Sequence, residues 1–359
     1  MNIRLPVFAL TLAMGCNPPI DLDTGNDDTG DADGPDHATA VVTTTDFAVG
    51  SLATVALDGH TVSDDLVPTT GDPRVFVEDG RVLQVNGLGF DTVSVFQPGD
   101  WSVPVTQFSV GAGTNPQDVA LVDGELFVTL YERAEIAVFD LATTHRSGTV
   151  DLAAFADADG LPEAASIVEL GGALYVALQQ LDRDNGWVPA GGRVIQVDPT
   201  SLAVTGSWEV GPNPTLHEHP AEPEMLVVRT GTYATLNGGL LVLDPATGQP
   251  DSVILESATL GYAIADYVES PSGNGLFIAE HTDFTYSVKC IDAGGEIAHG
   301  ETTTDWLAGL AVNDRGEAWI AQRSFAGTGG LVVWDVDTCT RLTATPIDTS
   351  LPPYRIAFY

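Results

Sequence analysis

A unit of four short apolar segments recurs along most of this chain, and no other feature restricts its fold as strongly. The clearest copy spans residues 117–152, where DVALV, ELFVTL, EIAVFDL and SGTVDL are separated by turns and a short loop. Runs of this length that are rich in β-branched and aromatic residues favour strands over helices. The centres of the second segments are separated by 44, 48, 51, 51 and 42 positions, at Leu83, Phe127, Tyr175, Leu226, Phe277 and Trp319. Four strands at such a period predict the blades of a β-propeller.

The third segment of most copies ends in an apolar residue and Asp, followed by residues typical of turns. The pattern occurs as ALDGH, VFDLATT, QVDPTS, VLDPATG, CIDAGG and DVDTCT, whereas the copy at 91–99 contains VFQPG. An Asp at this place can accept hydrogen bonds from the backbone N–H groups just ahead of it. We therefore expect an Asx-type turn that leads into the fourth strand.

The copies number seven, and one of them is divided between the two ends of the repeat region. Six are continuous, at residues 73–116, 117–164, 165–215, 216–262, 263–307 and 308–353. Residues 41–67 supply only three strands, and residues 354–359 (YRIAFY) form a strand without a blade of its own. Pairing this last strand with the first three closes the ring and leaves no open edge. The sequence thus predicts an all-β, seven-bladed propeller of four-stranded antiparallel blades, with a six-bladed ring as the alternative.

The first forty residues have the composition of an export signal and a tether. Residues 1–15 contain Arg4, a short apolar run and the small residue Gly15 directly before Cys16. This order resembles a bacterial lipoprotein signal, which implies that Cys16 is lipidated; an ordinary secretory signal is the alternative. Residues 16–40 are acidic, rich in Gly and free of aromatic residues, so we expect a disordered tether ahead of a propeller domain at 41–359.

The blade pattern resembles the bacterial YVTN-type, or YncE-like, seven-bladed propellers. The resemblance rests on Asn-Pro ahead of the first strand, at Asn115-Pro116 and Asn213-Pro214, and on LYV or LFV in the second strand. It implies an exported lipoprotein at the outer membrane or cell surface, with the periplasmic side as an alternative, that serves as a binding or scaffolding surface. It brings no catalytic residues to this chain.

The charge balance restricts the partners that the chain can bind. Fifty acidic residues face thirteen basic ones, for a formal net charge of −37. Such a charge argues against nucleic acid and against anionic lipid surfaces, so we expect membrane contact through the lipid anchor alone. We expect a monomer whose partner is an unidentified protein or a small anionic ligand.

Half of the basic residues beyond the signal map to one rim of the predicted ring. These are Arg74, Arg133, Arg183, Arg229, Arg323 and Arg355, which lie at the ends of second strands, in the loops after them, or at the starts of first strands. With Trp187 and Tyr233 as apolar walls, they predict a site for a carboxylate, a phosphate or an acidic peptide. The alternative is pairing with nearby carboxylates, for which Asp118, Asp182, Asp184, Asp266 and Asp305 are the candidates.

Two groups of residues are candidates for divalent metal sites. His217, His219 and His281 could form a zinc-type set, although two of them occupy positions that usually pack between blades. Asp157, Asp159 and Glu163 could share a calcium ion, although a turn at Gly160 explains the same segment.

Cys290 and Cys339 are the remaining cysteines, and both the paired and the unpaired state stay open, because neighbouring blades splay apart.

Two functions follow from these observations. The first is a lipid-anchored, non-catalytic propeller that presents a ligand- or protein-binding face. The second is a metal-dependent hydrolase or lyase that acts at the channel mouth through the three histidines. The sequence contains neither a Gly-x-Ser-x-Gly elbow nor a phosphate-binding Gly-rich loop, but propeller active sites are assembled from several blades.

Overall fold

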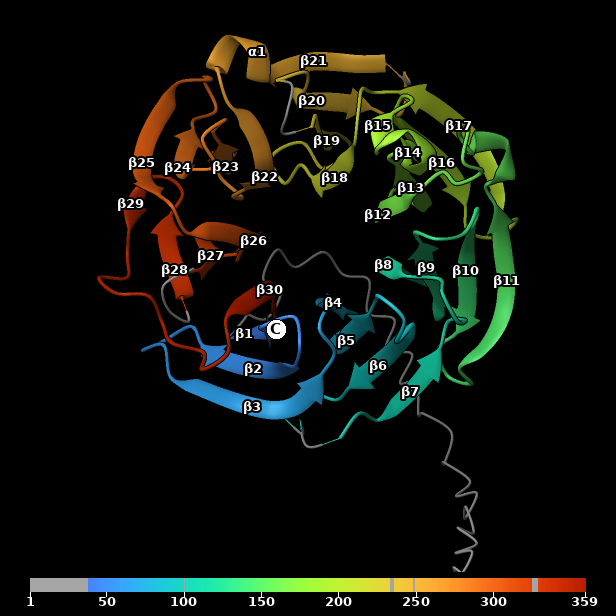
Figure 1. Cartoon of the computed structure of the whole chain (residues 1–359), viewed down its shortest axis with the longest axis horizontal. Helices are drawn as coiled ribbons and strands as arrows, with labels where there is room; N and C mark the ends of the chain where they lie inside the picture. The colour runs from blue at the N-terminus through green and yellow to red at the C-terminus, as the bar shows by residue number, and fades with distance from the viewer. Residues whose placement is uncertain (1–37, 100, 102, 233–235, 248, 325–328) are drawn as a thin grey trace, which may run out of the picture.

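A computed structural model describes residues 38–359 except 100, 102, 233–235, 248 and 325–328. Seven four-stranded antiparallel sheets surround a central axis, as Figure 1 shows, so the predicted seven-bladed propeller is confirmed. From the axis outward, blade one contains β30 (Pro353–Phe358), β1 (Thr39–Thr45), β2 (Gly50–Ala56) and β3 (Val62–Thr69). Blades two and three contain β4 (Pro73–Glu78), β5 (Arg81–Asn86), β6 (Thr92–Phe96) and β7 (Thr106–Ser109), then β8 (Pro116–Val122), β9 (Glu125–Leu130), β10 (Glu135–Asp140) and β11 (His145–Asp151).

The remaining blades follow the same plan. Blade four contains β12 (Ala164–Leu170), β13 (Ala173–Leu178), β16 (Arg193–Asp198) and β17 (Ala203–Glu209), with the small hairpin β14 (Leu181–Asp182) and β15 (Val188–Pro189) in its long loop. Blade five contains β18 (Thr215–Glu218), β19 (Leu226–Thr230), β20 (Gly239–Asp244) and β21 (Gln249–Glu256). Blades six and seven contain β22 (Ala263–Glu269), β23 (Gly275–Glu280), β24 (Tyr286–Ile291) and β25 (Ile297–Thr303), then β26 (Trp306–Val312), β27 (Glu317–Arg323), β28 (Gly330–Asp335) and β29 (Thr340–Arg341).

Helical structure is confined to short connections within the described ranges. The helix α1 (Ser257–Leu260) joins blades five and six, and two single turns of 3-10 helix lie at Ala153–Phe155 and Arg183–Asn185. No helix in the part of the chain that the structure describes is both long and apolar enough to cross a lipid bilayer.

The ring is closed by pairing of the two ends of the propeller domain, as the sequence predicts. β30 pairs antiparallel with β1, so that Val42 lies opposite Ile356 and Thr43 lies opposite Arg355. The last strand therefore fills the innermost place of blade one, which the N-terminal segment leaves empty. The expected signal peptide, Cys16 and most of the expected tether lie outside the described residues.

The turns follow from the Asp residues that mark the repeat. In blade three, Asp140 Oδ1 accepts the backbone N–H of Thr143 at 2.7 Å, and in blade seven Asp335 Oδ1 accepts that of Thr338 at the same distance. The expected Asx-type turn is thus present at these positions. Asp123 and Gly124, in the hairpin of the same blade three, have φ values of 51° and 81°, which suit a tight turn between twisted strands.

The core lies between the blades rather than within any one of them. Phe127 of blade three, for example, packs in one fully buried cluster with Leu174 and Val176 of blade four. At the closure, Trp319 of blade seven packs against Ile356 and neighbouring residues of blade one. Each blade therefore depends on both neighbours, and large apolar residues of the second strands, such as Phe127 and Trp319, pack against an adjacent blade.

Candidate binding site in the central channel

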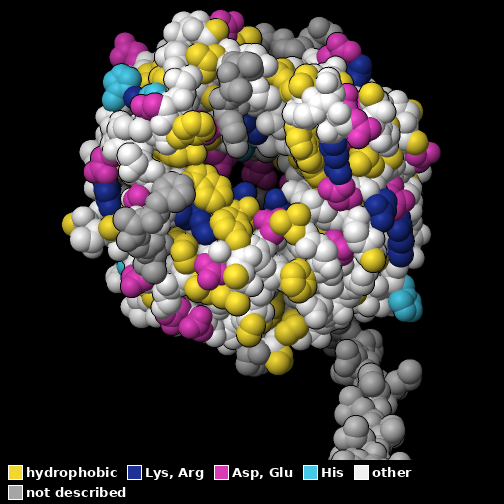
Figure 2. Space-filling model, viewed as in Figure 1, with side chains coloured by type: hydrophobic (Ala, Val, Ile, Leu, Met, Phe, Trp, Pro, Cys, Tyr) yellow, Lys and Arg dark blue, Asp and Glu magenta, His cyan; other side chains and the backbone are white. Residues whose placement is uncertain are grey.

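The innermost strands of the seven blades surround a channel, and Figure 2 shows basic and acidic side chains inside its opening. Two cavities of about 570 and 540 Å³ lie along the channel, and Arg355 lines both of them. The first is lined by blades five, six, seven and one, and the second by blades one to five. Together, the two cavities are therefore lined by residues from all seven blades.

β-Bulges near the start of four innermost strands shape the channel wall. The pairing with the second strand shifts within the first few residues of β8, β12, β22 and β26. Asp118 and Asp266 lie at two of these shifts, and each carboxylate accepts the N–H of the following residue, at 2.8 and 2.9 Å. Bulges of this kind re-aim side chains, and here both carboxylates become part of the cavity lining.

The first cavity contains two guanidinium groups. Arg229, in β19, donates from Nε to Thr215 Oγ1 at 2.8 Å and from Nη1 to a backbone oxygen of β22 at 3.5 Å. Arg355, in β30, donates from Nη1 to the backbone oxygens of Ala308 and Tyr354. Within the described residues neither guanidinium forms an ion pair, and burial lowers the pKa of both. Several donors of each group therefore remain available to a molecule in the cavity.

Carboxylates and apolar side chains complete the first cavity. Asp266 and Glu280 line it, and burial raises the pKa of both. His217 also lines it, but burial and then the charge of Arg229 lower its pKa to about 3, so the ring is neutral at pH 7. The apolar part of the wall is made by Ala263, Ile264, Ala265, Trp306, Leu307 and Ala308.

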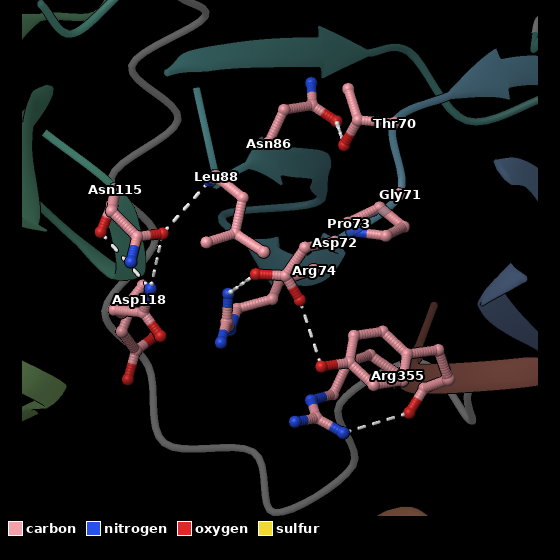
Figure 3. Close-up of polar contacts among 12 residues, drawn as sticks. Thr70, Gly71, Asp72, Pro73, Arg74, Asn86, Leu88, Asn115, Asp118 and Arg355 are labelled. Carbon is pink, nitrogen blue, oxygen red and sulfur yellow. Dashed lines mark hydrogen bonds and ion pairs between the residues drawn. The ribbon is translucent and has the colours of Figure 1, made fainter. Parts of the chain in front are cut away.

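An ion pair at the start of blade two lies beside the second cavity and is hydrogen-bonded to blade one. Arg74 lies 3.2 Å from Asp72, whose other oxygen accepts the hydroxyl of Tyr354 at 3.0 Å. In Figure 3, dashed lines join the Asp72 carboxylate to Arg74 and to the hydroxyl of an aromatic ring, which is that of Tyr354. Sequence reasoning missed Asp72 and Tyr354, although both lie within two residues of a predicted Arg.

Two further carboxyl groups, those of Glu78 and Asp118, line the second cavity, and the pKa of each is raised. Burial, followed by the charge of Asp118, raises the pKa of Glu78 to about 7. Burial also raises the pKa of Asp118 to about 7, although its Oδ2 accepts the N–H of Ile167 from the next blade at 2.9 Å. Asp118 was a candidate partner for the rim arginines, but in the structure its carboxylate bonds backbone N–H groups instead.

Arg183 lies away from the channel, in the loop of blade four. Its guanidinium contacts Glu132 of blade three and lies 3.8 Å from Asp159 and 3.5 Å from Glu163. Asp159 and Glu163 are two of the predicted calcium ligands, while Asp157 Oδ1 accepts the N–H of Asp159 at 3.0 Å. The cation of this cluster is therefore Arg183, which explains why so many carboxylates can lie together here.

Arg323 and Arg133 are also bonded within the protein. Arg323 donates to the backbone oxygens of Thr45, Pro352 and Pro353 and lies over the rings of Phe47, Trp306 and Tyr354. Arg133 is exposed and donates to two backbone oxygens. The structure thus brings Arg229 and Arg355 together in one cavity and Arg74 next to them, but it places Arg133, Arg183 and Arg323 elsewhere.

The loops that join second and third strands carry exposed apolar residues around the channel mouth. Phe47, Leu88, Trp187 and Phe284, from blades one, two, four and six, are exposed by 52%, 68%, 51% and 72%. All four have positive φ, at 70°, 48°, 65° and 62°, a region that bulky side chains rarely adopt. Backbone strain combined with exposed apolar surface is typical of a binding face.

Trp187 lines neither of the two cavities that contain the channel arginines. Trp187 stacks on Arg183, whose Cζ lies 5.0 Å from the ring centroid, and it lines a separate cavity of about 740 Å³ between the loops of blades four and five. Tyr233 lies outside the described residues.

The predicted zinc-type set is not assembled. The ring of His217 lies edge-on to Tyr267, His219 Nδ1 is 3.0 Å from Glu269, and His281 Nε2 is 2.8 Å from Ser287 Oγ. Within the described ranges, no group of three or more His, Cys, Asp or Glu side chains is arranged to hold a metal ion. The same finding applies to Asp157, Asp159 and Glu163, so neither metal prediction is supported.

The two distal cysteines are joined. Cys290 of blade six and Cys339 of blade seven form a disulfide, with their Cα atoms 5.8 Å apart. Blade seven approaches closely enough here because its outermost strand, β29, is only two residues long and Cys339 directly precedes it.

Several solved structures share this fold at low sequence identity. Hydrazine synthase of Kuenenia stuttgartiensis is 16% identical, with a TM-score of 0.58, and the match covers 74% of this chain and 76% of that chain. A protein of unknown function from Desulfotomaculum acetoxidans is 12% identical, with a TM-score of 0.59 and coverage of 89% and 98%. The dihydro-heme d1 dehydrogenase NirN, in complex with DHE, is 12% identical, with a TM-score of 0.54 and coverage of 89% and 75%. No family model and no curated protein matches the sequence. At these identities the likeness shows the propeller fold alone.

Proposed function

We propose that this protein is an exported, lipid-anchored propeller that binds a small anionic molecule in its central channel without transforming it. The observation that carries the proposal is the pair of guanidinium groups, Arg229 and Arg355, that line one cavity without an ion-pair partner among the described residues. Burying an unpaired cation is costly, so two such groups facing one hollow favour an anion as their partner.

The chemistry of arginine narrows the ligand to an oxyanion. A guanidinium group presents a planar fork of donors that matches a carboxylate or a phosphate. The size of the cavity, about 570 Å³, lies within the range of ordinary small-molecule sites. The exposed apolar residues around the mouth, including Phe47 and Trp187, offer additional contacts to a partner at the same face.

A screen of small carboxylates and phosphates by thermal unfolding tests the proposal. We expect at least one class to raise the melting temperature of the wild type, and Arg229→Gln to weaken its binding at least tenfold. Arg146→Gln is the matched control, because Arg146 pairs with Glu135 at the surface of blade three, away from the channel. The proposal would be refuted if Arg229→Gln and Arg146→Gln bound the ligand with equal affinity. It would also be refuted if the wild type bound no molecule that carries a carboxylate or phosphate group.

Lipidation of Cys16 is the part of the proposal that concerns location, and it rests on the sequence at residues 1–16. Fractionation of cells that express the wild type or Cys16→Ser tests it. We expect the wild type in the membrane fraction and the variant in the soluble fraction. A wild type that is wholly soluble and carries no lipid would contradict this assignment and would support an ordinary secretory signal.

A further inference from the structure

The first cavity of the channel holds charges of both signs that do not neutralise one another directly. Arg229 and Arg355 line it together with Asp266 and Glu280. None of these four side chains forms an ion pair with another, although the two arginines lie close enough to Asp266 to favour its charged form. Opposite charges that share a cavity but remain apart leave room for a molecule between them.

Each of these four cavity-lining side chains has at least one hydrogen-bonding atom that no described residue uses. Arg355 uses only Nη1 in its bonds to backbone oxygens, and Arg229 uses Nε and Nη1. Asp266 uses Oδ1 to accept the N–H of Tyr267, and Glu280 uses Oε1 to accept the hydroxyl of Tyr286. Within the described residues, Arg229 Nη2, Arg355 Nε and Nη2, Asp266 Oδ2 and Glu280 Oε2 take part in no such bond, so three donor nitrogens and two acceptor oxygens remain.

The balance of charge identifies the ligand more closely than the arginines alone do. When both carboxyl groups are ionised, the two guanidinium groups and the two carboxylates give the cavity no net charge, and the neutral ring of His217 adds none. A simple anion would pair with the arginines but would leave Asp266 and Glu280 without a cationic partner. A molecule with a carboxylate and an ammonium group would satisfy both pairs, since an ammonium group is a donor only and a carboxylate an acceptor only.

We infer that the ligand of this channel is a zwitterion, namely a free amino acid or a short peptide. The inference rests on the proposed function, because it takes the arginines as the carboxylate site and adds Asp266 and Glu280 as the ammonium site. The cavity of about 570 Å³ has room for such a molecule, and Ile264, Trp306 and Leu307 provide an apolar wall for its side chain.

Paired ligands that differ only in the amino group test the inference. The probes are the twenty L-amino acids and L-alanyl-L-alanine, each compared with its N-acetyl derivative, by thermal unfolding and then by titration calorimetry on the mature chain. Acetylation removes the positive charge and keeps the carboxylate, so we expect at least a tenfold loss of affinity. N-acetyl derivatives that bind equally well or better would overturn the inference and leave the proposed anion site standing. If no free amino acid or dipeptide binds, the inference is also wrong.

Variants of the two carboxylates separate an ammonium site from a merely structural role. Asp266→Asn and Glu280→Gln keep the size of each side chain and remove its charge. We expect each variant to bind the free amino acid at least fivefold more weakly than the wild type does. Its affinity for the N-acetyl derivative should be unchanged or higher. Glu301→Gln is the control, because Glu301 pairs with Arg341 on the outer strands of blades six and seven. Equal losses for both forms of the ligand would show that the carboxylates act only on the fold and would overturn the inference.

Discussion

Arg323 Nη2 donates a hydrogen bond of 2.7 Å to the backbone oxygen of Thr45, a residue 278 positions earlier in the chain. The same guanidinium donates to the backbone oxygens of Pro352 and Pro353 at 3.1 Å. Arg323 belongs to blade seven, Thr45 to the N-terminal part of blade one, and Pro353 to its C-terminal strand. One side chain therefore ties together the three segments that close the ring.

Replacing Arg323 with Met should destabilise the propeller. Arg323 is only 8% exposed, and its removal leaves three backbone oxygens at the closure, two of them in buried hydrogen bonds, without this donor. Hydrogen bonds from a charged donor contribute about 1.5–3 kcal/mol each, so we expect the free energy of unfolding to fall by about 2–4 kcal/mol. Urea unfolding measures the change. Arg146→Met, at a partly exposed ion pair, should change it by less than about 1 kcal/mol. Equal effects of the two changes would show that Arg323 does not hold the closure.

The disulfide should stabilise the last two blades. Cys290 and Cys339 are 49 residues apart, and a link that closes a loop of this length stabilises by about 4 kcal/mol in the chain-entropy model. Addition of a reductant should lower the urea midpoint of the wild type but not that of Cys290→Ala/Cys339→Ala. A wild-type midpoint that stays unchanged after both thiols have been shown to be free would contradict this prediction.

The stability of the protein should depend on pH through Glu78. Burial raises the pKa of Glu78 from 4.5 to about 7, so the folded state keeps a proton that the unfolded state releases above about pH 4.5. The stability that comes from this proton is present below pH 4.5 and is lost as the pH rises through 7. Glu78→Gln stays neutral at every pH, so its stability relative to the wild type should rise between pH 5 and pH 8 by about 1–3 kcal/mol.

Urea unfolding at pH 5, 6.5 and 8 measures the effect of Glu78→Gln, with Glu301→Gln as the control. Parallel pH profiles for the wild type and Glu78→Gln would show that the Glu78 carboxyl is solvated like an exposed one.

The fold could be predicted from the sequence because its signals are local and repeated. The Asp at the end of most third strands forms its turn with residues two or three positions ahead, as Asp140 does with Thr143. The closure could be predicted because residues 354–359 form a strand pattern that lacks a blade. In each case the pattern in the sequence and the contact in the structure involve the same few residues.

The channel could be predicted only in part, because its contents depend on bulges and on contacts between distant blades. The shift in β22 decides where Asp266 lies relative to its neighbours, and a strict alternation of side chains along the strand does not reveal it. Arg323 ends the second strand of blade seven and Arg183 lies in the loop after the second strand of blade four, yet one contacts backbone oxygens and the other acidic side chains. The histidines were grouped by sequence spacing, but each of the three has a different neighbour.

The central claim is that Arg229 and Arg355 form a ligand site in the channel, and titration calorimetry of the wild type and Arg229→Gln tests it most directly. The titrant is the tightest binder among the oxyanions and amino acids described above, at low and at physiological salt. We expect one site per chain for the wild type and at least a tenfold weaker affinity for a variant that still melts cooperatively. Wild-type and Arg229→Gln proteins that bind with the same affinity, or a wild type that binds none of these molecules, would contradict it.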